Sequence, residues 1–370
     1  MTPVTTVDLA VNVVLLLGDT ALFAALRRQP ERPGFVCTVA ALLAVLVAAG
    51  VGFAAAGGGD PFALIRGAAW VVFAHGPIDL MVAALGARRA APKQAVALAT
   101  TALVATGVGM DAFLVEPPRV ETTFHEIRSA EVEEWIRIVV LADLQVETVT
   151  DRERAIVAAA MAEEPDLVLL AGDYLQLSDA REAEYLLESE SWKALIGALD
   201  APLGVYAVRG NAEVRSSWAS DLFGGSGVTS FRETASVDLG PLVLTGLSFW
   251  DGFDRDHTVD DAGKFHVVLA HAPDFSLSEK VHADLLVAGH THGGQVRLPF
   301  VGPLVTFSAV PRAQAAGGSF PLADGRQLVV SRGLGMERGT APPLRFLCPP
   351  ELVVIDVVPP DWQWESPPGG

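Results

Sequence analysis

The amino-acid sequence predicts an α/β protein in which an N-terminal four-helix transmembrane region precedes a layered α/β sandwich. Two observations lead to this fold class. The 370 residues are 51% hydrophobic with a mean hydropathy of +0.38, and the apolar excess is concentrated in residues 1–115. After Glu116 the composition becomes mixed and acidic, and short apolar runs alternate with helical stretches, as they do in layered α/β domains.

The N-terminal part contains four apolar segments, at about 7–26, 35–57, 62–86 and 94–115. Each is close to the ~20 residues that a helix needs to cross the hydrocarbon core of a bilayer. A secretory signal peptide does not fit, because the start lacks a basic region and further apolar segments follow. We therefore expect residues 1–115 to form an integral membrane domain of four spans.

The Lys and Arg residues between these segments predict the orientation in the membrane. The first link contains Arg27, Arg28 and Arg32, the third contains Arg88, Arg89 and Lys93, and the second, AAAGGGD, contains neither residue type. Basic links stay in the cytoplasm, so the N-terminus and everything after Val115 are expected on the extracytoplasmic side. This orientation requires that the third segment crosses the membrane.

Four polar residues lie within the predicted spans: Asp19, Arg66, His75 and Asp79. Ionisable groups inside a membrane are often functional, so these four form either a polar relay or structural pairs and interfacial residues. We favour the structural alternative.

The acidic balance of the chain lies in its C-terminal part. Residues 1–115 hold 7 of the 26 Lys and Arg and 6 of the 44 Asp and Glu, which leaves 19 and 38 for residues 116–370. This excess of negative charge disfavours nucleic acid as a partner, because phosphates are bound by Lys and Arg. The two cysteines, Cys37 and Cys348, supply neither a disulfide framework nor a cysteine zinc site.

A sharp change in composition at VEPPRVE, residues 115–121, marks a linker. We assign residues 116–135 to this linker, 136–358 to the soluble domain and 359–370 to a tail. Buried-strand patterns then follow one another, beginning with RIVVLAD (137–143), DLVLLAGD (166–173) and GVYAVRGN (204–211).

Polar residues stand just after the predicted strands, where open α/β sheets bind ligands. They are Asp143, Asp173, Asn211, His271, His290 and His292. Each one alone is more typical of a turn, a cap or a buried structural histidine. Together, carboxylate, amide oxygen and imidazole form the mixed ligand set of a pair of divalent metal ions such as Mn, Fe or Zn.

The order AD, GD, GN, AH and GHTHGGQ resembles the calcineurin-like binuclear metallophosphoesterases over residues 136–357. GHTHGGQ followed by SRGLG (331–335) is most similar to membrane-associated or exported bacterial members. The resemblance implies a four-layer α/β sandwich and metal-dependent hydrolysis of a phosphoric ester. The metals would lower the pKa of a shared water molecule, and the resulting hydroxide would attack phosphorus in line.

The resemblance also implies a role for each of the six polar residues. It assigns them to two metal ions: Asp143 and His292 to the first, Asn211, His271 and His290 to the second, and Asp173 to both. Asp173, Asn211 and His290 are accordingly expected to take part in catalysis. Arg332 of the SRGLG motif is expected to clasp the substrate phosphate, with a structural salt bridge as the alternative.

Two residues depart from the family pattern. Gln145 stands where the family usually has a histidine, and it is either a weaker ligand of the first metal or no ligand at all. Ala212 replaces the histidine that usually follows Gly-Asn and cannot donate a proton to a leaving group. His257, His266 and Arg209 are the candidates to replace that acid.

The sequence therefore predicts a membrane-anchored, metal-dependent phosphoesterase with its catalytic domain outside the cytoplasm. Its substrate would be a phosphomonoester or phosphodiester, such as a phospholipid or a phosphoester of the cell envelope. The alternative is a catalytically attenuated sensor that binds metal and phosphate without turnover, which the replacements at Gln145 and Ala212 motivate.

Overall fold

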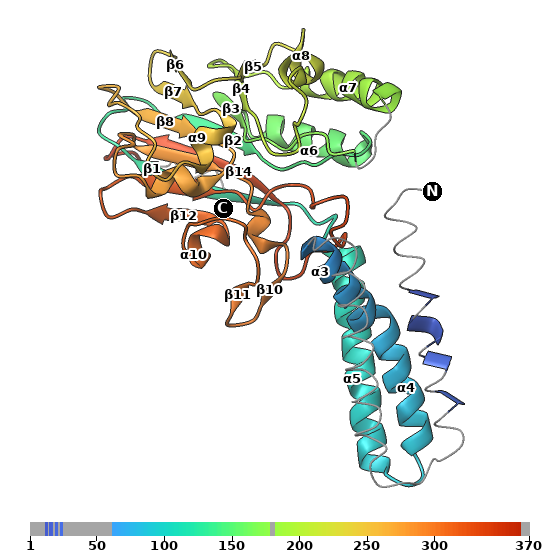
Figure 1. Cartoon of the computed structure of the whole chain (residues 1–370). Coiled ribbons are helices and arrows are strands. Elements are labelled where there is room, and N and C mark those ends of the chain that lie inside the picture. The colour runs from blue at the N-terminus through green and yellow to red at the C-terminus, as the bar shows by residue number, and fades with distance from the viewer. Residues whose placement is uncertain are drawn as a thin grey trace, which may run out of the picture. The chain divides into compact units, whose positions relative to one another are not determined.

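The computed structural model describes residues 61–177 and 182–363, together with part of 12–24 (Figure 1). The chain divides into two compact units. One comprises residues 1–115 with the short segment 337–344, and the other comprises residues 116–336 and 345–370.

The stretch from residue 61 to residue 115 in the first unit is almost entirely helical. Its helices are α3 (Pro61–Trp70), the π-helical turn η1 (Val71–His75), α4 (Gly76–Ala87), α5 (Pro92–Met110) and the π-helical turn η2 (Asp111–Val115). Pro92 occupies the first turn of α5, where its missing N–H removes no helical hydrogen bond.

Two continuous helices in this unit are long and apolar enough to cross a membrane, Ile65–Ala87 with 23 residues and Pro92–Val115 with 24. They correspond to the third and fourth predicted spans. The first predicted span is described only in part, and the second, 35–57, lies outside the described residues. The four-helix transmembrane region therefore remains a prediction.

Three of the polar residues predicted within the spans, Asp19, Arg66 and His75, make polar contacts in this unit. Nδ1 of His75 lies 2.6 Å from Oδ2 of Asp19, and Nε2 of His75 lies 3.0 Å from Oδ1 of Asn12. Arg66 donates to the carbonyl oxygens of Gly339 and Ala341 in segment 337–344, at 3.2 and 3.0 Å.

The second unit contains two six-stranded mixed sheets. The first sheet has the order β1-β14-β2-β3-β4-β5. Its strands are β1 (Glu121–Arg128), β14 (Glu351–Val358), β2 (Ile136–Leu141), β3 (Leu167–Leu170), β4 (Val205–Val208) and β5 (Thr229–Phe231). The second sheet has the order β12-β13-β9-β8-β7-β6. Its strands are β12 (Gly318–Pro321), β13 (Gln327–Val330), β9 (Leu285–Ala288), β8 (His266–Leu269), β7 (Val243–Gly246) and β6 (Ala235–Asp238).

The two sheets pack face to face, and helices cover the first sheet. Ile138 and Leu167 of the first sheet share a core with Val267 of the second. The alternate residues of the first sheet pack on α6 (Asp151–Ala162), α7 (Glu182–Ile196) and α8 (Trp218–Phe223), through side chains such as Trp192. Part of the far face of the second sheet is covered by the short helix η3 (Pro273–Leu277), whose Phe275 lies in that core. The short helix α9 (Phe249–Phe253) packs against η3. The central strands are buried on both faces, which explains their continuous apolar runs and confirms the mixed α/β class.

One strand lies where the sequence predicted only a linker. β1 pairs in parallel with β14 along eight residues at the edge of the first sheet. Its sequence ETTFHEIR alternates between exposed and half-buried positions, so it lacks the continuous apolar run by which the central strands were identified. An edge strand with one wet face needs only this weaker pattern.

Candidate metal centre

The six polar residues predicted from the strand ends come together where parallel strands of the two sheets finish. Strands β2, β3 and β4 run parallel to one another, as do β7, β8 and β9, so their carboxyl ends lie at common edges. Asp143, Asp173 and Asn211 follow the first three strands, whereas His271 follows β8 and His290 and His292 follow β9.

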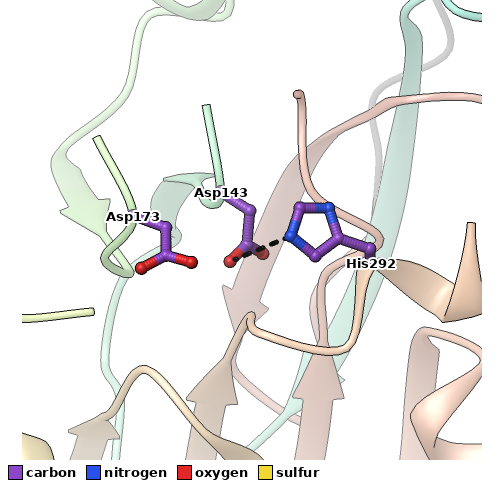
Figure 2. Close-up of side chains that lie close together, drawn as sticks. All are labelled: Asp143, Asp173 and His292. Carbon is purple, nitrogen blue, oxygen red and sulfur yellow. Dashed lines mark ion pairs between the residues drawn. The ribbon is translucent and has the colours of Figure 1, made fainter. Parts of the chain in front are cut away.

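Asp143, Asp173 and His292 form one half of this cluster (Figure 2). Each offers one ligand atom, and these atoms lie within 4.8 Å of one another. Nε2 of His292 is 3.9 Å from Oδ1 of Asp143, whose carboxylate stands between the other two side chains in Figure 2. All three side chains are buried, so they are placed to hold a metal ion away from bulk water.

Asn211, His271 and His290 form the other half. Oδ1 of Asn211 lies 2.9 Å from Nε2 of His271 and 3.1 Å from Nδ1 of His290, and these two nitrogens are 3.2 Å apart. Asp173 reaches this half as well, because its Oδ1 is 3.7 Å from Nε2 of His271. Its carboxylate is therefore shared between the two halves.

The tautomers of both histidines follow from their other ring nitrogens. Nδ1 of His271 lies 2.8 Å from the carbonyl oxygen of Ala171, and Nε2 of His290 lies 3.3 Å from that of Phe307. A carbonyl oxygen only accepts, so these two nitrogens carry the protons. Burial lowers the pKa of His271 to about 4, and burial together with the nearby His271 lowers the pKa of His290 to about 4.

Three lone pairs therefore face one another at neutral pH, those of His271 Nε2, His290 Nδ1 and Asn211 Oδ1. Acceptors at this spacing with no proton between them repel, and a cation relieves that repulsion. Two neutral imidazoles oriented by backbone carbonyls, with an amide oxygen and a carboxylate, suit a divalent transition metal. The residues of both halves thus fit the two divalent ions expected here.

Five site residues adopt the left-handed backbone region that side chains other than glycine rarely occupy. Their φ angles are +50° for Asp143, +43° for Gln145, +56° for Asp173, +71° for His290 and +48° for His292. Strained φ values of this kind persist where the surrounding structure imposes them, and they cluster at functional sites.

Close packing of the backbone holds these conformations. A Cβ atom on Gly210 would lie 2.2 Å from Oδ1 of Asp173, and one on Gly335 would lie 2.1 Å from the carbonyl oxygen of Leu144. No side chain fits at either position, so both glycines are required for the approach of neighbouring loops to the site.

Glu213 joins two of the loops that carry predicted metal ligands. Its carboxylate accepts backbone N–H groups from Asp173 at 3.0 Å, Tyr174 at 2.8 Å and Gly210 at 2.9 Å. Burial raises the pKa of Glu213 to about 8, with the Asp173 carboxylate adding to the rise and the three N–H groups opposing it. Sequence reasoning missed this role, and the only signal was an acidic residue two positions after Asn211.

The two departures from the family pattern both contact Asp173. Gln145 is buried and donates from Nε2 to Oδ2 of Asp173 at 3.2 Å. The backbone N–H of Ala212 donates to Oδ1 of the same carboxylate at 2.8 Å. Burial raises the pKa of Asp173, and these donors lower it. Both residues thus hold the shared carboxylate in place.

The three candidates for the missing acid lie in different surroundings. Nδ1 of His257 is 3.5 Å from Oδ1 of Asp251. His266 lies at the start of β8, whereas the cluster follows strand ends, and its Nε2 is 2.7 Å from Oγ1 of Thr245. Arg209 follows β4, two residues before Asn211, which makes it the nearest of the three along the chain.

The structure places Arg332 against two carboxylates. Its guanidinium lies 3.2 Å from Oε1 of Glu351 and 3.5 Å from Oε2 of Glu121, and its backbone N–H donates to Glu351 at 2.9 Å. The guanidinium therefore makes the structural salt bridge that was the alternative expectation, whereas a contact with the substrate phosphate stays a prediction.

Arg345 supports the SRGLG loop and was missed by sequence reasoning. It is fully buried, and it donates to the carbonyl oxygens of Gly335 at 2.9 Å, Cys348 at 3.0 Å, Arg332 at 2.9 Å and Gly333 at 3.1 Å. The N–H of Gly335 in turn donates to the carbonyl of Asp143 at 2.7 Å. A buried guanidinium thus fixes the loop against which the first aspartate is set.

Comparison with known proteins finds a family model, sequence relatives and solved structures that are similar to this chain. The family model described as calcineurin-like phosphoesterase matches residues 136–294. The metallophosphoesterase YkuE of Bacillus subtilis is 29% identical over 277 residues, covering 70% of this chain and 93% of YkuE. The phosphodiesterase YaeI of Escherichia coli is 29% identical over 218 residues, covering 55% of this chain and 74% of YaeI. A solved dimetal phosphatase from Danio rerio is 13% identical with a TM-score of 0.36, covering 55% of this chain and 88% of that one.

Proposed function

Because the chain belongs to the calcineurin-like phosphoesterase family and is a metal-dependent phosphoric ester hydrolase, we propose that it is a membrane-anchored phosphodiesterase with two divalent metal ions. The observation that carries this proposal is the convergence of the lone pairs of His271, His290 and Asn211 beside the shared Asp173 carboxylate. Mn, Fe and Zn are the metals that such a ligand set accepts.

Each half of the cluster has its own part in this proposal. Asp143 and His292 would hold the first ion, Asn211, His271 and His290 would hold the second, and Asp173 would serve both. When bound, such ions would supply a water of lowered pKa as nucleophile and neutralise charge on the phosphoryl oxygens. Gln145 contributes as a donor to Asp173, and Glu213 fixes the loops from which Asp173 and Asn211 project.

The methyl group of Ala212 has no proton to give to the leaving group. Positioned acids contribute about 10²–10⁴-fold to rate, so esters whose leaving group departs without protonation are favoured. The relative YaeI, a phosphodiesterase, supports a diester over a monoester. Arg209, two residues before Asn211, can contribute positive charge.

The membrane part of the proposal rests on the two long apolar helices and on the basic links between the predicted segments. We place four spans in residues 1–115, a connecting segment at 116–135 and the catalytic domain at 136–358, outside the cytoplasm. An envelope phosphoester is then within reach of the site.

A metal and turnover assay on the whole chain tests this function. The detergent-purified protein is freed of metal, loaded with Mn²⁺, Zn²⁺ or Mg²⁺, and assayed on bis(p-nitrophenyl) phosphate and p-nitrophenyl phosphate. We expect metal-dependent hydrolysis, faster on the diester, which Asp173→Ala abolishes and the exposed His282→Ala preserves. Two bound metals without turnover would favour the sensor alternative, and a chain that binds no metal would refute both.

A further inference from the structure

The hairpin of β10 (Arg297–Leu298) and β11 (Gly302–Pro303), with the residues up to Phe307, exposes several large apolar side chains. The hairpin projects from the body of the domain (Figure 1). Phe300 is fully exposed, and exposure continues at Leu298, Val301, Leu304, Val305 and Phe307. A contiguous apolar surface of this kind marks an interaction site on a soluble domain.

The hairpin is joined directly to the metal centre. The carbonyl oxygen of Phe307 accepts from Nε2 of His290 at 3.3 Å. The carboxylate of Asp274 then holds the following residues, accepting from Oγ of Ser308 at 2.6 Å and from the N–H of Ala309 at 2.8 Å. The base of the hairpin is therefore attached to the loop that carries His290, a predicted metal ligand.

The root of the hairpin is tied by hydrogen bonds to Glu116, the residue that follows the last apolar helix in sequence. Phe346 pairs with the strand that leads into the hairpin, because its N–H donates to Gln295 and its carbonyl accepts from Arg297, each at 2.9 Å. The next residue, Leu347, donates its N–H to the carboxylate of Glu116 at 2.8 Å. Glu116 directly follows Val115, the last residue of the long apolar helix. If that helix spans a bilayer, the hairpin root is at the bilayer surface.

The charge of this segment differs from that of its domain. Residues 116–370 hold twice as many acidic as basic residues, whereas residues 293–323 contain no Asp or Glu and include the exposed Arg312. An anionic lipid surface repels the rest of the domain but not this segment. Charge and apolar exposure therefore select the same occupant, a phospholipid bilayer.

A second aromatic element reaches the same imidazole from α9. The ring of Phe253 lies 5.0 Å from that of His290, and Phe249 packs on both Phe253 and Trp250. Trp250 is 73% exposed, and tryptophan is enriched where membrane meets water. Apolar groups thus border the metal centre on two elements, as an amphiphilic ester requires.

We propose that the hairpin, residues 297–307, inserts Phe300 and its apolar neighbours into the bilayer beside the chain's own spans, and that the substrate is a phospholipid-type phosphodiester drawn from that bilayer. The substrate part of this proposal rests on the proposed function, whereas the insertion of the hairpin does not.

Spin labels on the whole chain test the insertion. Phe300→Cys and, as a matched control, Leu187→Cys on α7, where Leu187 is 66% exposed, are made in a Cys37→Ser background, since Cys348 is buried. The chains are reconstituted in vesicles of phosphatidylethanolamine and phosphatidylglycerol. We expect the label at position 300 to collide several-fold more with oxygen and less with a water-soluble nickel chelate than the label at position 187. Equal accessibility to the nickel chelate at both positions would overturn the insertion.

Turnover in the same vesicles tests the substrate class. The double variant Phe300→Asp/Val301→Asp should lower release of the phosphatidylglycerol headgroup by about tenfold or more, because charges are disfavoured in the bilayer. Hydrolysis of bis(p-nitrophenyl) phosphate should stay within about twofold of the unmodified chain, and Leu187→Asp should change neither rate. Hydrolysis of the aryl diester without the lipid, or an equal loss on both, would overturn the substrate class. If the unmodified chain did not hydrolyse the aryl diester, the proposed function would be refuted instead. The accessibility of the spin labels would still decide whether the hairpin inserts.

Discussion

Nε2 of His271 and Nδ1 of His290 lie 3.2 Å apart. The other ring nitrogen of each histidine is protonated and faces a backbone carbonyl oxygen. Two imidazole lone pairs at this distance do not attract each other. They are held together by strand ends of the second sheet and by burial, which lowers both pKa values to about 4. The pair is therefore preorganised for a cation.

Loss of one imidazole should remove one metal ion. His290→Ala leaves the half formed by Asp143, Asp173 and His292 intact, so metal analysis should show one ion per chain instead of two. The affinity for the second ion should fall by more than the roughly 10–100-fold that loss of an outer-shell partner costs. His282→Ala, at an exposed position, should retain both ions. Loss of both ions from His290→Ala would show that the halves are not separate.

Protonation of His271 and His290 should destabilise the metal-free chain in acid. Both histidines have pKa values of about 4 when folded and about 6.5 when unfolded. The unfolded chain therefore binds more protons at these two imidazoles below pH 6.5, so their contribution to stability rises with pH in that range. Glu213, whose pKa in the folded chain is about 8, contributes with the opposite sign. Between about pH 4 and 6.5 each histidine should contribute up to about 1.4 kcal/mol per pH unit. Unfolding is followed by tryptophan fluorescence in EDTA at a series of pH values. The slope of unfolding free energy against pH should contain this histidine contribution, and His271→Gln should reduce the slope. A slope unchanged in that variant would contradict the assigned pKa.

Glu213→Gln should loosen the two loops that it joins. An amide offers one acceptor oxygen where the carboxylate accepts three backbone N–H groups, so at least one buried donor loses its partner. Each such loss costs about 1–3 kcal/mol. We expect a lower unfolding midpoint and weaker metal binding, with the exposed Glu279→Gln as a control. An unchanged midpoint would show that the loops are held by other contacts.

Restoring a histidine at position 212 should change the response to the leaving group. Ala212→His supplies the acid that this chain lacks, so hydrolysis of alkyl esters, whose leaving groups need a proton, should rise by about 10²-fold or more. Aryl esters should gain much less. The dependence of kcat on leaving-group pKa measures this directly, and Ala212→Gln controls for side-chain volume. An equal gain on both ester classes would indicate a role in binding instead.

The sequence predicted the parts of the site that follow buried strands. Asp143, Asp173 and His271 stand just beyond continuous apolar runs, and parallel strands bring such positions together. Arg332 was expected to clasp a substrate phosphate, with a structural salt bridge as the alternative, and its partners Glu121 and Glu351 lie outside its own motif. Neither pairing has a local pattern, so only the folded chain reveals it.

The supporting residues were missed for the same physical reason. Glu213 and Arg345 are charged groups whose partners are backbone atoms, some of them in loops far away in sequence, and backbone atoms carry no sequence signal. β1 was read as a linker because one of its faces is wet, which leaves an alternation too weak to identify without its neighbour β14.

The left-handed conformations of Asp143, Asp173 and His290 tie the lifetime of the protein to its metal supply. Each such residue costs of order 1–3 kcal/mol in the fold, and bound ions return stability by mass action because they bind only the folded state. A cell short of divalent metal would then hold the less stable form, which proteases remove faster. The amount of this protein would follow metal availability without any dedicated regulator.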